Sequence, residues 1–167
     1  GVQTCALSLS FEGPGVRDDV EFTQIVQPVN QDDEALNDQI SPDGSHAFIV
    51  TRKADVASDT NLYELKLLDL RPVSLAAKTA PSPVTVLSAK VGEDVRFTDP
   101  SVKLVHWHGD RTLVFLARLA GLSPQVYTLD ILTRKLTRLT AASDLIVSYA
   151  ESQDLRRVVY AVIAPNP

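Results

Sequence analysis

Two of the three histidines flank a tryptophan, in the segment His106-Trp107-His108. On a strand, this spacing places both imidazoles on one face, as a His-x-His metal pair requires. A third ligand would have to come from elsewhere, and the remaining histidine, His46, lies in a predicted turn. We therefore expect turn-capping or exposed histidines, with no metal site and no other cofactor. Trp107 is predicted to anchor the core, because its large ring can fill the space between adjacent sheets.

Serine-based acyl transfer needs a nucleophile, a base and donors for the oxyanion. The nearest match to a Gly-x-Ser-x-Gly nucleophile elbow is Gly121-Leu122-Ser123-Pro124-Gln125. This segment lacks the closing glycine, and it lies between two predicted strands instead of between a strand and a helix. The sequence therefore predicts no catalytic residue in this chain.

The single cysteine and the N-terminal acidic residues are weak candidates for a disulfide or a metal site. The single cysteine, Cys5, excludes an internal disulfide and a thiolate metal cage. Acidic residues crowd the N-terminal part without the Asp-x-Asp-x-Asp-Gly order of a calcium loop, so we interpret them as a solvated segment. These acidic residues are Asp18, Asp19, Glu21, Asp32, Asp33, Glu34 and Asp38.

The elements that would position these residues are β-strands. Residues 112–117 and 125–132 are rich in β-branched and aromatic side chains, which suit a pleated, half-buried surface. The loop between them contains a glycine and a proline, which fit a strand interior poorly. Residues 136–140 then alternate leucine with threonine or arginine at period two. This pattern predicts one antiparallel sheet.

The pattern recurs along the chain. Ser41-Pro42-Asp43-Gly44 is a strong turn signal before an apolar strand, and similar turns are expected at Trp107 and Glu151. From Trp107 to Glu151 is 44 residues (151 minus 107), within the period of roughly 40–50 residues of four-stranded propeller blades. We therefore predict an all-β fold, made of antiparallel four-stranded blades of a partial β-propeller. Tyr63 with Asp69, and Tyr127 with Asp130, are interpreted as structural features of the repeat.

The repeats define the predicted domain organisation. Residues 1–39 form an N-terminal approach segment that contains the first strand or strands. Residues 40–167 hold about two and a half repeats, at residues 40–91, 101–140 and 145–167. We expect the repeats to continue beyond the chain. The strands are expected to bury Phe48, Val50, Tyr63, Leu65, Trp107, Val114, Leu116, Tyr127, Leu129, Val159 and Ala161.

Composition narrows the class of protein. The chain has 167 residues, 44% of them apolar and 22% charged, which is typical of a globular protein. Its formal net charge is −5 and its longest basic run is Arg156-Arg157, so nucleic acid is not an expected partner. The longest apolar run is shorter than 18 residues, so a membrane is not expected either. The sequence is compatible with a bacterial periplasmic or secreted protein and with a cytoplasmic one.

The repeats resemble those of TolB and of the prolyl oligopeptidase family of serine peptidases. From Asp18 to Pro165, the order and spacing are similar to the start of bacterial peptidases of that family. His108-Gly109-Asp110 and Ser152-Gln153-Asp154 depart from the Pro-Asp-Gly turn. The resemblance rests on Ser41-Pro42-Asp43-Gly44, Asn61-Leu62-Tyr63, Leu68-Asp69-Leu70, Trp107, Asp110-Arg111, Val114-Phe115-Leu116, Gln125-Val126-Tyr127-Thr128-Leu129-Asp130 and Leu139-Thr140.

The resemblance implies a non-catalytic propeller segment that caps a separate α/β-hydrolase domain and gates access to it. The expected partners are that C-terminal hydrolase domain or the rest of the propeller, together with the peptide substrate of the parent protein. The alternative is a TolB-like propeller that acts as a protein-interaction scaffold without any peptidase. A generic β-sandwich module is the third interpretation. Because a partial propeller leaves edge strands unpaired, we also expect self-association through open sheet edges.

Overall fold

A computed structural model describes residues 23–27, 38–71, 81–92, 101–119, 123–141, 143 and 145–163. Cys5 lies outside these residues, as do all the N-terminal acidic residues except Asp38. Gly121 and Leu122 of the Ser123 segment lie outside them as well. The predictions for these positions stay predictions.

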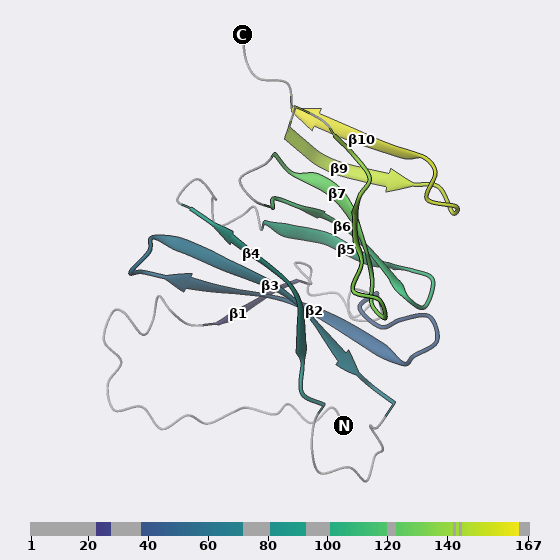
Figure 1. Cartoon of the computed structure of the whole chain (residues 1–167), viewed down its shortest axis with the longest axis horizontal. Coiled ribbons are helices and arrows are strands. Elements are labelled where there is room, and N and C mark those ends of the chain that lie inside the picture. The colour runs from purple at the N-terminus through teal and green to yellow at the C-terminus, as the bar shows by residue number, and fades with distance from the viewer. Residues whose placement is uncertain are drawn as a thin grey trace, which may run out of the picture.

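The described residues form three antiparallel sheets that follow one another in chain order (Figure 1). The first two sheets have four strands each, in sequential order, and the third is a two-stranded hairpin. The predicted all-β fold of antiparallel four-stranded sheets is therefore confirmed. The strands are β1 (Gln24–Gln27), β2 (His46–Asp55), β3 (Thr60–Asp69), β4 (Val84–Val91), β5 (Val102–His108), β6 (Thr112–Ala117), β7 (Gln125–Asp130), β8 (Leu136–Arg138), β9 (Leu145–Glu151) and β10 (Val158–Ile163).

The first edge of the first sheet is built from two separate pieces of chain. β1 pairs with the middle of β2, with Gln24 opposite Arg52. Ile40 forms an isolated antiparallel bridge to Ala47, near the start of the same strand. Part of the predicted approach segment thus belongs to the first sheet.

The turns before β2 and β10 have the same hydrogen-bond pattern. Before β2, the Ser41 hydroxyl donates to Asp43 Oδ1 at 2.7 Å and accepts from the His46 amide at 2.9 Å. Before β10, the Ser152 hydroxyl donates to Asp154 Oδ1 at 2.6 Å and accepts from the Arg157 amide at 3.0 Å. Ser152 is thus the counterpart of Ser41, one position later than the sequence alignment placed it.

One position in these two turns differs in its conformational cost. Gly44 has a φ of 70°, and its counterpart Leu155 has a φ of 57°. The left-handed region is open to glycine, whereas it costs a residue with a Cβ atom about 1–2 kcal/mol. The serine and aspartate side chains therefore preserve the turn in the third sheet despite the loss of glycine.

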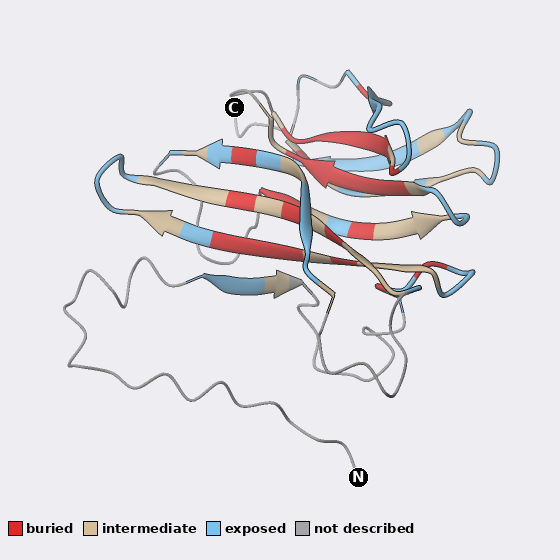
Figure 2. Cartoon of the chain, turned by 60° about the horizontal axis from the view of Figure 1, so that its bottom comes forward, coloured by how far each residue is buried: buried red, intermediate tan, exposed pale blue. Residues whose placement is uncertain are grey.

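Burial is greatest in the second sheet, which has a neighbour on each face (Figures 1 and 2). Alternate residues of β6 face opposite neighbours: Leu113 and Phe115 pack in the core shared with the first sheet, and Val114 and Leu116 in the core shared with the third. All four are fully buried. Phe115, which alternation places opposite Val114, is buried because both faces of β6 are covered.

The predicted burial of two residues in β10 is wrong. Val159 is 74% exposed, and Ala161 is also exposed. Both lie on the face of the hairpin that points away from the second sheet, and no described segment covers that face. The remaining predicted core residues are buried, except for Trp107, which is partly buried against the core.

The end of the second sheet depends on the Leu139-Thr140 pair. The Leu139 amide donates to the Val126 carbonyl at 2.8 Å, and the Val126 amide donates to the Thr140 hydroxyl at 3.0 Å. Thr140 in turn donates to Gln125 Oε1 at 2.9 Å. The threonine side chain thus satisfies a buried backbone amide beyond the end of β8, where no strand pairs with it.

Candidate functional site

Strand β5 directs its side chains toward two different sheets. Trp107 points to the first sheet, where its indole Nε1 donates to the Gln39 carbonyl at 2.8 Å and its ring lies 6.2 Å from that of Phe48. His106 and His108 point to the third sheet, as the alternation of a strand requires. The predicted role of Trp107 as an anchor between sheets is thus seen in its contacts.

The two histidines converge on one carboxylate of the third sheet. His106 Nε2 lies 2.7 Å from Glu151 Oε1, and His108 Nδ1 lies 3.7 Å from the same oxygen. The Glu151 side chain is only 11% exposed, against 39% for His106 and 23% for His108. The spacing that places both imidazoles on one face was predicted, whereas the acidic partner was not.

Tyr149 completes this cluster from the strand that carries Glu151. Its hydroxyl donates to the Leu104 carbonyl at 2.8 Å, and its oxygen lies 3.3 Å from His106 Nδ1. The two rings stack with their centroids 5.7 Å apart. Burial, aided by the negative charge of Glu151, raises the pKa of Tyr149 well above its usual range, so the phenol keeps its proton.

The carbonyl that Tyr149 bonds is presented by a distortion of β5. The pairing of β5 with β6 shifts register between Lys103 and His106, and Leu104 in this interval has a φ of 52°. A bulge with a left-handed residue redirects the backbone, and such strain is concentrated at functional positions. Here the bulge brings the Leu104 carbonyl to the third sheet.

A constant offset in sequence underlies these contacts. His106 with Glu151, Leu104 with Tyr149, and the His108 ring with the Gln153 carbonyl are each 45 residues apart. This offset is one residue longer than the 44-residue repeat read from the sequence. Matching Ser152 instead of Glu151 to Ser41 lengthens the repeat by one residue, and this longer repeat would have paired these positions.

Nucleophilic chemistry has little support at the serines that the structure describes. The Ser123 hydroxyl donates to the Ser143 carbonyl at 3.3 Å, and no histidine is its partner. A closer arrangement, which sequence reasoning missed, is the Ser45 hydroxyl between the Asp43 carboxylate, at 2.7 and 2.8 Å, and His46 Nδ1, at 2.6 Å.

The Ser45 arrangement has the wrong order for a catalytic triad. In a triad the histidine lies between the serine and the acid, whereas here the serine lies between the other two. The adjacent amides are also engaged: that of Gly44 donates to the Ser41 carbonyl and that of Ser45 donates to Asp43. The Ser41 hydroxyl, together with the amide and hydroxyl of Ser45, lowers the pKa of Asp43 to about 2. The group therefore caps a turn.

The described residues contain no cluster of three or more His, Cys, Asp and Glu side chains placed to hold a metal ion. They also contain no helix long and apolar enough to cross a bilayer.

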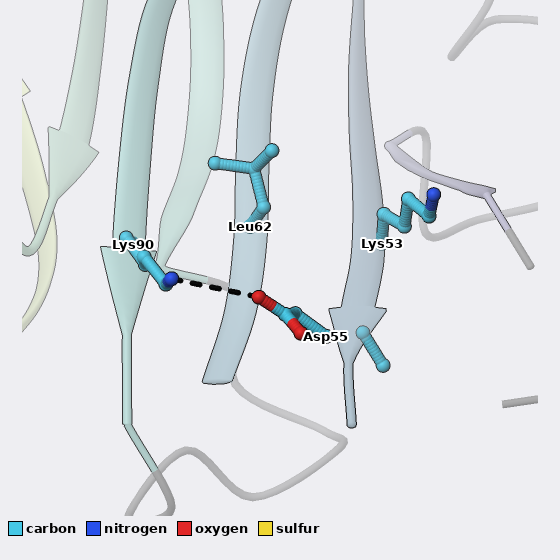
Figure 3. Close-up of a pocket in the computed structure, with 5 residues that line it drawn as sticks. Lys53, Asp55, Leu62 and Lys90 are labelled. Carbon is cyan, nitrogen blue, oxygen red and sulfur yellow. Dashed lines mark ion pairs between the residues drawn. The ribbon is translucent and has the colours of Figure 1, made fainter. Parts of the chain in front are cut away.

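An open hollow lies on the outer face of the first sheet (Figure 3). Lys53, Leu62 and Lys90 lie side by side across β2, β3 and β4. Lys90 Nζ pairs with Asp55 Oδ2 at 3.5 Å, and both side chains are well exposed. This is a solvated charged surface, and its two lysines surround no buried polar group that would mark a binding site.

Comparisons with known proteins assign no family to the chain. No family model matches the chain, and a search of curated proteins finds no match. The apo structure of the isopeptidase AtxE2 matches 66% of this chain and 18% of its own, with 15% identity and a TM-score of 0.48. The acylaminoacyl peptidase of Pyrococcus horikoshii matches 70% of this chain and 15% of its own, with 14% identity and a TM-score of 0.45. The chain thus spans less than a fifth of either protein, and no activity follows from the match.

Proposed function

We propose that this chain is a non-catalytic propeller segment that caps the α/β-hydrolase domain of a prolyl oligopeptidase-like serine peptidase and gates access to it. The observation that carries the proposal is the succession of sheets built from consecutive strands, each packed face to face on the last. The repeat residues from Ser41 to Thr140 that resemble this family supply the second support.

The chemistry of the described residues agrees with a non-catalytic role. Ser123 bonds a backbone carbonyl, and Ser45 is held in a turn whose neighbouring amides are already bonded. A peptidase would therefore need its nucleophile, base and oxyanion donors from a separate domain. The partners are then that hydrolase domain, the rest of the propeller and the peptide substrate.

The test compares the protein encoded by the complete reading frame with the 167-residue chain. A fluorophosphonate probe should label the complete protein at a serine in a Gly-x-Ser-x-Gly segment, and it should leave the 167-residue chain unlabelled. Gating is tested with a short peptide amide and a long polypeptide: the complete protein should cleave the first and spare the second. Labelling of the short chain that is lost on mutation of one serine would overturn the non-catalytic role.

The alternative function is an interaction scaffold without a peptidase. It is favoured by β10, whose six residues carry no charge and whose Val159 and Ile163 are more than half exposed. Uncharged edge strands readily pair with another chain, which could also be a second copy of this one. A complete reading frame without a hydrolase segment, combined with a concentration-dependent dimer in sedimentation experiments, would support this alternative over the first.

A further inference from the structure

The contact between β5 and β9 has an unusual balance of hydrogen-bond donors and acceptors. A carbonyl oxygen and a carboxylate can only accept, and a tyrosine hydroxyl has one hydrogen to donate. A neutral imidazole has one N–H, whereas an imidazolium has two. The number of hydrogens on the nitrogens of each ring therefore decides which charge state fits the contact.

At His108, both ring nitrogens face acceptors. Nε2 lies 2.9 Å from the Gln153 carbonyl oxygen, so this nitrogen must donate. Nδ1 lies 3.7 Å from Glu151 Oε1. In a neutral ring, Nδ1 would hold only a lone pair beside this carboxylate, whereas the imidazolium places a positive charge there at ion-pair distance.

At His106, too, the number of hydrogens on the ring nitrogens favours the imidazolium. Nε2 donates to Glu151 Oε1 at 2.7 Å. Nδ1 lies 3.3 Å from the Leu104 carbonyl and 3.3 Å from the Tyr149 oxygen, whose single hydrogen is already given to Leu104 at 2.8 Å. If the His106 ring is neutral, the single hydrogen of Tyr149 can go either to the Leu104 carbonyl or to the Nδ1 lone pair. The other acceptor then stays unsatisfied.

We propose that His106, His108, Glu151 and Tyr149 form a proton-dependent clasp between the second and third sheets. The clasp is complete when both rings are imidazolium ions around the Glu151 carboxylate. It therefore tightens as the pH falls and both rings gain their second proton, and it is lost when the Glu151 carboxylate is neutralised. The clasp is a property of these two sheets and does not depend on a hydrolase partner.

Other charges near the clasp do not change this sign. The turn between β5 and β6 carries Asp110 and Arg111, and the turn between β9 and β10 carries Asp154, Arg156 and Arg157. Asp154 is bonded by the Ser152 hydroxyl and the Arg156 amide and pairs with the Arg156 guanidinium. Aspartate and arginine ordinarily change charge outside the range of pH 5 to 8, whereas histidine changes charge within it, so the two histidines supply the change.

Amide hydrogen exchange of the 167-residue chain tests the clasp. After correction for intrinsic exchange, the protection of β9 amides relative to β3 amides should rise by roughly 3- to 10-fold from pH 8 to pH 6, the range expected for two partly exposed ionic contacts together. In Glu151→Gln, which retains an acceptor but loses the charge, this change should shrink to less than about twofold. His46→Gln, in a turn that lacks contact with Glu151, is the matched control and should keep the full change.

Protection of β9 that is unchanged or higher at pH 8 in the unmutated chain would overturn the clasp. So would a Glu151→Gln variant with the full pH dependence. If that variant does not fold, the ring nitrogens of the unmutated chain provide an independent measurement. Their ¹⁵N shifts should report two protonated nitrogens on each of His106 and His108 at pH 6, and neutral rings at this pH would refute the proposal.

Discussion

The junction between the first and second sheets and the junction between the second and third differ in what holds them. The first is a continuous apolar core that contains the large rings of Phe48, Tyr63, Phe115 and Tyr127. The second has a smaller buried core of aliphatic side chains, and it adds the histidine–glutamate–tyrosine contact at one end. Cohesion therefore comes from buried area at the first junction and partly from charge and hydrogen bonds at the second.

This difference separates what each junction responds to. Apolar packing depends on buried area and not on charge, so the strength of the first junction is insensitive to pH between 5 and 8. The polar contact at the second junction depends on protonation and on salt, because its ion pairs are partly exposed. Neighbouring residues of β6 pack into the two junctions, so a substitution at one position weakens the first junction and a substitution at the next position weakens the second.

The largest expected effect comes from the first junction. Phe115→Ala removes a fully buried ring that stacks on Tyr127 with centroids 6.0 Å apart, and it should lower the free energy of unfolding by about 3–5 kcal/mol. Leu116→Ala, one position on, should cost about 2–5 kcal/mol and should expose β9 and β10 first. Urea denaturation gives the magnitudes, and hydrogen exchange gives the location. A loss below about 1 kcal/mol for Phe115→Ala would contradict an area-dominated first junction.

A smaller effect should appear in the turn of the third sheet. Leu155→Ala and Leu155→Gly both remove a side chain that packs against the core between the second and third sheets, but only glycine relieves the φ of 57°. The free energy of unfolding of Leu155→Gly should therefore exceed that of Leu155→Ala by about 0.5–1 kcal/mol. The reciprocal change in the first-sheet turn, Gly44→Ala, should lower the free energy of unfolding of the chain by about 1 kcal/mol. Gly92→Ala is the control, because a Cβ atom there meets open space and its φ lies outside the left-handed region. Equal urea midpoints for Leu155→Gly and Leu155→Ala would show that the turn bears no strain.

The smallest effect concerns acid titration of the same two turns. Hydrogen bonds hold the pKa of Asp43 at about 2, below the value of about 3.9 of an unfolded aspartate. Because the folded pKa is lowered, this stabilisation is present above about pH 3.9 and is lost as the pH falls toward 2. Carboxyl ¹³C NMR of the unmutated chain and of Ser41→Ala measures it, and the serine change should raise the pKa. In the third-sheet turn, Ser152→Ala should do the same for Asp154, whose pKa the Ser152 hydroxyl also lowers.

The sheets could be predicted from sequence because their signals are local. Period-two alternation over residues 136–140 and the turn at Ser41-Pro42-Asp43-Gly44 need no knowledge of distant residues. The exposure of Val159 was missed because burial on a strand depends on whether a neighbouring sheet covers that face. The alternation of β10 is compatible with either outcome, and only the arrangement of the sheets decides it.

Only part of the polar contact between β5 and β9 could be predicted from the sequence. The His106 and His108 spacing placed both rings on one face, but Glu151 could be paired with them only through a repeat period of 45 residues. The sequence alignment was one residue short, because it matched Glu151, not Ser152, to Ser41. The bulge at Leu104 had no signal, since leucine is rarely found at positive φ.

The sequential strand order has a consequence for the order in which the protein folds. Each sheet uses only consecutive strands, so its backbone pairing requires no residue from a later sheet. Contacts close in sequence form faster than distant ones, and domains emerge from the ribosome N-terminus first. The first sheet can therefore form while the second is still being synthesised. Each new sheet then finds an apolar face ready to receive it, which shortens the time that uncharged strands such as β6 stay unprotected.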